Sequence, residues 1–173
     1  MASDFGLMVD NKPESQDFIT GGYSSLVKAA QPGPILDNQG NILGEHRGIP
    51  FYTIGQRKGL GISAKEPLYV VDIDPGRNAI IVGSKDEVYR DELIASGLNW
   101  IAIEELKRPT KVKARIRYRH KETEAIITPL RQDRLYVKFK EPQMAITPGQ
   151  AVVFYRGDVV IGGGTIETQG LEA

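Results

Sequence analysis

Residues 111–119 read KVKARIRYR, and this stretch decides the fold class of the chain. Basic and apolar side chains alternate along it with a period of two, which is the pattern of a half-buried β-strand. A strand of this kind buries residues 112, 114, 116 and 118 and displays residues 111, 113, 115, 117 and 119 on its other face. Five cations on one strand face predict a surface that attracts a polyanion.

Further short runs of this type surround the stretch and predict a β-barrel. Separate strands are expected over residues 100–103, 124–130, 134–140, 150–155 and 158–167. Glycine and proline turns separate them at regular intervals, which is typical of small antiparallel barrels. Together with residues 111–119 these runs predict a six-stranded antiparallel β-barrel.

The residues that precede the barrel predict a smaller β-rich (α+β) domain. Residues 34–36 and 41–43 flank a turn, residues 68–73 and 78–82 flank another, and each pair predicts a β-hairpin. Residues 23–30 predict one short helix, and residues 84–92 predict a short helix or a linker. We therefore expect a mainly β protein with a central domain over residues 19–95 and a barrel over residues 96–173.

The charge of the chain is balanced overall but strongly uneven along it. The 173 residues contain 22 Lys and Arg and 22 Asp and Glu, so the formal net charge is zero. Residues 107–140 hold twelve of these cations and three of these acids, which gives +9 there and −9 elsewhere. This excludes a uniformly basic nucleic-acid binder but favours a local binding surface. The alternative is a solvated sheet face without a partner.

Several kinds of site are disfavoured by composition. The chain has no cysteine, which excludes disulfides, thiolate metal ligands and cysteine nucleophiles within it. Its two histidines, His46 and His120, are too few for a metal cluster, and we expect His46 to be a hydrogen-bonded structural residue. There is no apolar run of transmembrane length and no signal-peptide pattern, so a cytoplasmic protein without a membrane partner is expected.

The glycine-rich run GQRKGLG at residues 55–61 is open to three interpretations. Glycines expose backbone N–H groups, and the side chains of Arg57 and Lys58 could hold an anion. The spacing is neither that of a P-loop nor that of a dinucleotide-binding loop. A structural turn with Gln56, Arg57 and Lys58 as an RNA or domain contact is favoured over a protein-docking loop or a nucleotide-binding enzyme site.

The chain resembles the bacterial tRNA-specific 2-thiouridylases over nearly its whole length. The resemblance rests on six motifs in matching order and spacing: GEHRG at 44–48, YTIGQRKGLG at 52–61, NW at 99–100, RYR at 117–119, TPGQAVVFY at 147–155 and GGGTI at 162–166. It implies that residues 19–173 are the central domain and the C-terminal barrel of a longer enzyme. Residues 1–18 would then be the end of the preceding catalytic domain.

This resemblance implies the activity of the intact protein. Family members thiolate the wobble uridine of tRNA, using ATP and Mg bound to an N-terminal domain, and a sulfur-relay protein or cysteine desulfurase supplies the sulfur. We therefore expect this chain alone to be inactive, to hold no cofactor, metal site or catalytic residue, and to be a monomer. The persulfide cysteine that usually follows the segment resembling residues 12–17 is missing, since residues 18–23 read FITGGY.

The tRNA contacts of the family carry over only where its motifs match. Arg117 and Tyr118 match a contact pair in the barrel, and Gln150 matches another contact position. Strict alternation points Tyr118 inward, so a contact there requires the strand to end or twist. The candidate tRNA-binding residues combine these matches with the basic strand face: Lys113, Arg115, Arg117, Tyr118, Arg119 and Gln150. The alternatives are a docking module for a sulfur carrier and a stand-alone RNA-binding β-barrel.

Overall fold

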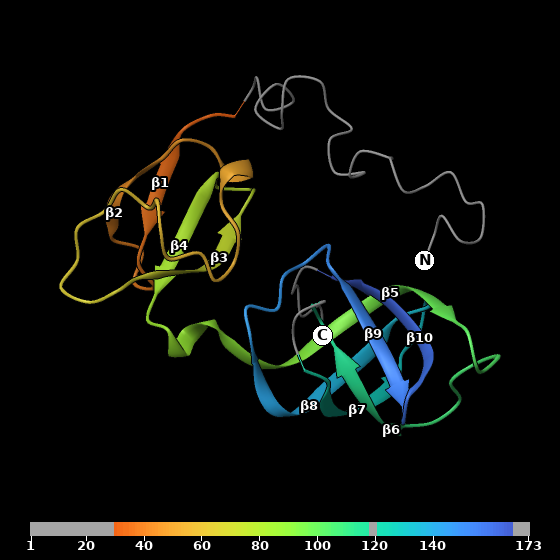
Figure 1. Cartoon of the computed structure of the whole chain (residues 1–173). Helices are drawn as coiled ribbons and strands as arrows, with labels where there is room; N and C mark the ends of the chain where they lie inside the picture. The colour runs from red at the N-terminus through yellow and green to blue at the C-terminus, as the bar shows by residue number, and fades with distance from the viewer. Residues whose placement is uncertain (1–29, 118–120, 168–173) are drawn as a thin grey trace, which may run out of the picture.

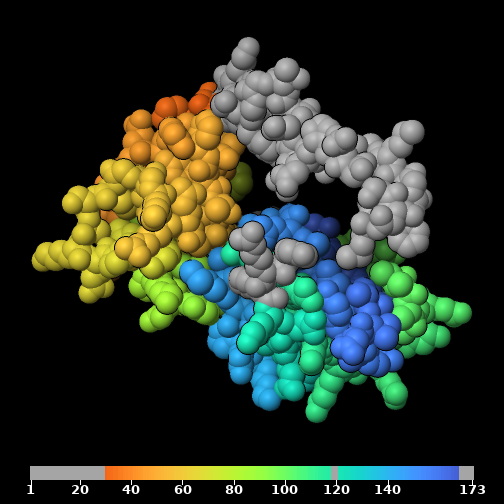
Figure 2. Space-filling model, in the orientation of Figure 1, coloured from red at the N-terminus to blue at the C-terminus, as the bar shows by residue number. Residues whose placement is uncertain are grey.

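A computed structural model describes residues 30–117 and 121–167 and folds most of them into β-strands. The strands form two units, a small sheet near the N-terminal side and a closed barrel (Figure 1). Figure 2 shows the two units as separate lobes, the sheet in orange and yellow and the barrel in green to blue. The expected mainly β fold is therefore confirmed. The segment of residues 1–18 and nearly all of the helix expected at 23–30 lie outside the described residues.

The small sheet contains the two hairpins that the sequence predicts. The first joins β1 (Gly33–Leu36) to β2 (Ile42–His46), and the second joins β3 (Tyr69–Asp74) to β4 (Ala79–Gly83). The strand order is β2-β1-β4-β3, with β1 parallel to β4 and the other pairs antiparallel. A short 3-10 helix, η2 (Ile49–Phe51), follows β2. The core of this unit is apolar throughout: Ile35, Leu60, Val70, Ile80 and Val82.

The barrel closes in the order β10-β5-β8-β7-β6-β9. Its strands are β5 (Tyr89–Trp100), β6 (Thr110–Arg115), β7 (Thr123–Pro129), β8 (Leu135–Met144), β9 (Ala151–Arg156) and β10 (Val159–Ile166). All neighbouring pairs are antiparallel. The prediction of a six-stranded antiparallel barrel is confirmed, and closure leaves the sheet without an exposed edge.

Several boundaries differ from the sequence prediction. The strand expected at residues 111–119 ends at Arg115, and β8 continues to Met144 beyond the expected end at residue 140. The segment expected as a helix or linker forms one turn of 3-10 helix, η3 (Asp86–Val88), and then enters β5 at Tyr89. The strand expected at residues 100–103 is wrong beyond Trp100, where β5 ends. The chain turns there because the backbone N–H groups of Ile101 and Ala102 both donate to the Ile161 carbonyl, at 3.0 and 3.4 Å.

The triple glycine of β10, residues 162–164, makes room for the Trp100 ring at the barrel core. The pairing register shifts between Val160 and Gly162 and again between Gly163 and Thr165, so bulges interrupt the strand on both sides of Gly162. A Cβ atom at Gly162 would lie 2.5 Å from the Trp100 ring, so only glycine fits beside this indole. Trp100 in turn packs on the fully buried Phe154, with ring centroids 6.2 Å apart. Phe154 is thus a core residue of the barrel, and the partly buried Trp100 packs against that core.

The two units meet at a small apolar joint. Val71 on β3, Val88 in η3 and Ala145 after β8 are buried together. The Ala145 N–H donates to the Val88 carbonyl at 2.9 Å. Gly55 approaches Ala145 so closely that a Cβ atom on it would lie 2.6 Å from the Ala145 Cβ. The first residue of the glycine-rich loop therefore packs against the barrel.

Candidate nucleic-acid interface

Strand β6 presents two lysines on the outer surface of the barrel. Val112, Ala114 and Ile116 are buried, whereas Lys111 and Lys113 are exposed, as the alternation predicts. Neighbouring strands then determine what surrounds the lysines. Lys113 pairs with Glu124 on β7 and with Tyr155 on β9, and Lys111 pairs with Ile126 on β7.

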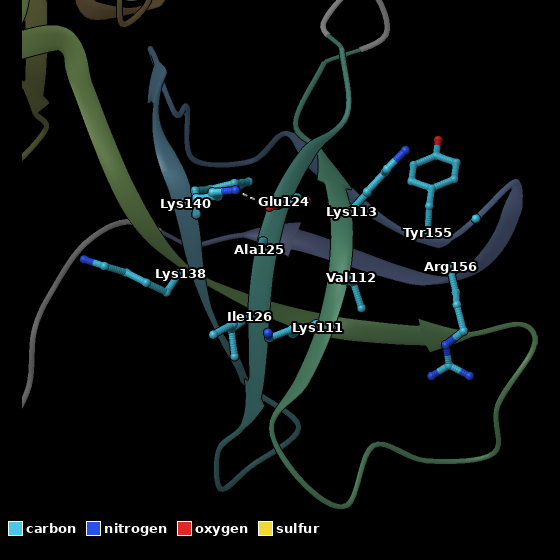
Figure 3. A pocket seen from close by; sticks show the side chains of 12 residues that line it. Lys111, Val112, Lys113, Glu124, Ala125, Ile126, Lys138, Lys140, Tyr155 and Arg156 are labelled. Carbon is cyan, nitrogen blue, oxygen red and sulfur yellow. Dashed lines mark hydrogen bonds and ion pairs between the residues drawn. The ribbon is translucent and has the colours of Figure 1, made fainter.

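A groove of about 600 Å³ runs across the outer surface of β6, β7, β8 and β9. Figure 3 shows Lys113 beside Tyr155 and shows Arg156 extending in another direction from the same strand. The only acid among the lining residues is Glu124. The cations of the lining come from three strands: Lys111, Lys113, Lys138, Lys140 and Arg156.

Only some of the cations that line the groove form ion pairs within the barrel. Lys140 lies 2.7 Å from the Glu124 carboxylate, and Lys138 lies 2.9 Å from Asp91 and 3.4 Å from Glu92. Over the described ranges, the groove's other three cations have no ion-pair partner: Lys111, Lys113 and Arg156. Cations that are held on a rigid sheet and lack a carboxylate partner are suited to bind phosphate groups.

The single acid of the groove stays ionised. The hydrogen bond from Lys140 lowers the pKa of Glu124, and the charges of Lys111 and Lys113 lower it further. The same contact raises the pKa of Lys140. The hydrogen bond to Asp91 likewise raises the pKa of Lys138. Five cations and one carboxylate thus leave the groove lining with a net charge of +4 near neutral pH.

Arg115 is less exposed than the sequence pattern suggests. Its guanidinium donates to the Glu122 carboxylate at 2.7 Å, and both side chains are about one quarter exposed. The Arg115 Cζ also lies over the Tyr155 ring, 5.0 Å from its centroid. This cation–π contact holds the ring in place at the wall of the groove. Arg115 therefore contributes to the candidate interface indirectly, by positioning Tyr155.

Arg117 also has partners within the protein. Its guanidinium donates to the Ala145 carbonyl at 2.7 Å and to the Thr147 hydroxyl at 3.2 Å. Strand β6 has ended by then, at Arg115, so the strand alternation no longer sets the direction of this side chain. The Gln150 N–H donates to the Thr147 carbonyl at 3.3 Å, and Gln150 is exposed. Arg117 and Gln150 thus meet at the same turn, residues 147–150.

The remaining basic-strand candidates lie outside the described residues. These are Tyr118 and Arg119, together with His120. Their contacts with tRNA stay predictions that rest on the sequence.

The loop of residues 55–61 is closed by one of its own candidate residues. The Gln56 side chain accepts from the Thr53 N–H at 3.2 Å and donates to the Lys58 carbonyl at 2.9 Å. Its amide is therefore used inside the loop, while the side chains of Arg57 and Lys58 are exposed. Arg57 lines a hollow of about 380 Å³ beside the loop. The loop combines a structural turn with two exposed cations.

His46 is a structural residue, as expected. It is 1% exposed, its Nδ1 accepts from the Gly48 N–H at 3.0 Å, and its Nε2 lies 2.9 Å from the Asn78 carbonyl. These contacts require a neutral ring with the proton on Nε2. Nowhere in residues 30–117 and 121–167 do three or more His, Asp or Glu side chains gather as a metal-binding group would. No helix in these ranges has the length and apolar character to span a bilayer.

Of the groove residues, sequence reasoning named only Lys113 as a tRNA-binding candidate and placed Lys111 on the same strand face. Lys138 and Lys140 alternate with buried residues along β8, which is the same signal that marked residues 111–119. A count of basic residues on every predicted strand could have found these two. Ile126, Tyr155 and Arg156 give no such signal, because their place in the groove depends on which strands pair.

In the described part of the chain, the barrel carries an outer groove lined by lysines, which is a geometry suited to a polyanion. Comparisons with known proteins show which families the two units resemble. The model of the "tRNA methyl transferase PRC-barrel domain" matches residues 24–84, and that of the "Aminomethyltransferase beta-barrel domain" matches residues 90–166.

Curated relatives match nearly the whole chain. The tRNA-specific 2-thiouridylase MnmA 1 of Thermoanaerobacter pseudethanolicus is 51% identical over 96% of this chain, which is 48% of that protein. The tRNA-specific 2-thiouridylase MnmA of Halothermothrix orenii is 49% identical over 96% of the chain and 49% of that protein. The chain belongs to the tRNA-specific 2-thiouridylase family, and it spans about half the length of the curated relatives it matches.

Proposed function

We propose that this chain binds tRNA as the central and C-terminal part of a tRNA 2-thiouridylase. The intact protein would thiolate the wobble uridine of tRNA with ATP and Mg bound in another domain, in the cytoplasm. The chain would hold the tRNA and take no part in the chemistry. The observation that supports this most strongly is the groove, in which Lys111, Lys113 and Arg156 have no acidic partner among the described residues.

The candidate residues divide into two roles under this proposal. Lys111 and Lys113 neutralise phosphates, because an ammonium on a flexible stem suits a backbone contact that carries no sequence information. Tyr118, Arg119 and Gln150 remain proposed contacts. Arg117 supports the proposed contact of Gln150 by fixing the turn of residues 147–150 on which Gln150 lies.

The test is the salt dependence of tRNA binding by this chain. A surface that neutralises several phosphates releases counterions, so the logarithm of the binding constant falls linearly with the logarithm of the salt concentration. We expect a negative slope in a fluorescence-anisotropy titration between 50 and 200 mM salt. At about 0.7–0.9 per neutralised phosphate, three contacts correspond to a loss of roughly 20-fold to 40-fold in the binding constant over this range. Weak binding that ignores salt would contradict the proposal.

A second proposal concerns the loop of residues 55–61. Gln56 fixes the loop from within, so Arg57 and Lys58 are presented on a firm backbone and are exposed. We propose this loop as the docking point of the sulfur-relay protein or cysteine desulfurase. The double variant Arg57→Ala/Lys58→Ala should abolish capture of that partner and leave the salt slope of tRNA binding unchanged. Retained capture would reject the docking role.

A further inference from the structure

The groove holds an aromatic side chain that the phosphate contacts do not use. Tyr155 is half-buried, lines the groove and lies opposite Lys113 in the β6–β9 register. Its phenol ring is a flat apolar surface among cations. Rings in such surroundings are the platforms on which proteins stack nucleic-acid bases.

The ring of Tyr155 is fixed before any ligand arrives. Arg115 lies over it at 5.0 Å, and Glu122 holds the Arg115 guanidinium at 2.7 Å. The chain of contacts Glu122–Arg115–Tyr155 therefore restricts the ring at little further entropic cost on binding. A platform that is already ordered binds a base more tightly than a mobile side chain would.

The neighbouring cations have the spacing that a single strand of nucleic acid needs. Lys113 stands beside the ring, and Lys111 lies two residues away on β6, about 6.5 Å further along the strand. Arg156 follows Tyr155 on β9 and extends in another direction from the strand (Figure 3). Successive phosphates along one side of a stacked nucleotide can thus meet Lys113 and then Lys111.

We propose that this groove binds an unpaired nucleotide of RNA, with its base stacked on Tyr155 and its neighbouring phosphates against Lys113 and Lys111. The base must be unpaired because both faces of a base inside a duplex are already stacked. The ligand class is therefore a loop, a bulge or a single-stranded end. This inference rests on the proposed function, since it names which part of an RNA the basic groove receives.

The test compares a short fluorescein-labelled oligouridylate with a blunt RNA duplex of equal length at one salt concentration. Tyr155→Leu keeps an apolar side chain and removes the aromatic ring, and Tyr155→Phe restores the ring without the hydroxyl. We expect Tyr155→Leu to weaken oligouridylate binding by about 5-fold to 150-fold, and Tyr155→Phe to bind within about 2-fold of the unaltered chain. Neither change should affect duplex binding.

Two controls separate stacking from damage to the fold. Tyr89 is 39% exposed on β5 and does not line the groove, so Tyr89→Leu is the matched tyrosine control and should change nothing. Thermal unfolding of each variant checks that the barrel is intact. An oligouridylate with one 2-aminopurine reports stacking directly, because the fluorescence of this base is quenched when it stacks. The unaltered chain should quench it, and the Tyr155→Leu variant should not.

The other outcomes discriminate between this inference and the proposed function. Suppose that Tyr155→Leu binds normally while the double variant Lys111→Ala/Lys113→Ala loses salt-dependent binding. The stacking site would then be overturned and tRNA binding would stand. If the unaltered chain binds neither RNA with any salt dependence, the proposed function itself fails. A third outcome would also overturn the inference. If polyglutamate of matched charge displaces the oligouridylate as well as RNA does, and Tyr155→Leu leaves the affinity unchanged, the groove would be assigned to an acidic protein.

Discussion

The two ends of residues 111–117, a segment that contains most of β6 and two residues after it, carry the same alternating pattern but differ in their contacts. At one end, Lys111 and Lys113 are exposed on the barrel and have no ion-pair partner in the described ranges. At the other end, Arg115 and Arg117 are half-buried and bonded to protein groups. Arginine has five donors in a planar fork, so it can bind several protein acceptors at once, whereas lysine is a point charge on a flexible stem. Alternation thus gives the face on which a side chain lies but not its partner.

The largest effect is expected at the joint that Arg117 supports. Gly55→Ala would place a Cβ atom 2.6 Å from the Ala145 Cβ, at a backbone φ of +85°. We expect overpacking and backbone strain to lower the free energy of unfolding by about 2–4 kcal/mol, as measured by urea denaturation. Gly40→Ala is the matched control, because Gly40 has a φ of +84° with nothing within 4 Å of the added carbon. Equal losses in both variants would show that the contact between the two units contributes nothing.

Removing the Arg117 guanidinium should be the next largest change. Arg117→Ala loses hydrogen bonds to the Ala145 carbonyl and the Thr147 hydroxyl, and we expect a loss of about 1.5–3 kcal/mol of unfolding free energy. Arg117→Lys keeps the charge but not the fork, so it should restore little of that stability. Full stability of Arg117→Ala, with a large loss of tRNA binding in both variants, would instead make Arg117 a direct RNA contact.

Removing the two lysines should have almost no effect on stability, in contrast to removing the Arg117 guanidinium. Lys111→Ala/Lys113→Ala removes two exposed side chains without ion-pair partners in the described residues, and we expect the unfolding free energy to stay within about 0.5 kcal/mol. Lys65→Ala/Lys85→Ala, at two exposed positions outside the groove, is the charge-matched control. A loss of more than 1 kcal/mol in the double variant would mean that the lysines hold the barrel together, as the arginines do.

Much of the fold could be predicted from the sequence because short-range patterns set it. The alternation in β6, the turns around residues 37–40 and 74–77, and the glycines of β10 each specify local geometry. The end of β5 was placed too late, because a hydrogen bond to the distant Ile161 carbonyl turns the chain after Trp100. A hydrogen bond to a residue that is distant in the chain cannot be predicted from the local sequence.

The site was less predictable for the same reason. Lys113 could be named from its own strand, but its neighbours Glu124 and Tyr155 come from strands that pair with β6 only in the folded barrel. The partners of Arg115 and Arg117 are seven residues and about thirty residues away in the chain. Whether a cation on a predicted strand is free or occupied is therefore a property of the tertiary structure.

Under our proposal Lys111 and Lys113 contact RNA, whereas Arg115 and Arg117 stabilise the structure. The most direct test is the salt slope of tRNA binding for the unaltered chain, for Lys111→Ala/Lys113→Ala and for Arg117→Lys. We predict that the double lysine variant flattens the slope by about 1 to 2, since each lost phosphate contact contributes about 0.7–0.9, and that Arg117→Lys leaves the slope unchanged. An unchanged slope in the double lysine variant, or a flattened slope in Arg117→Lys, would contradict the account.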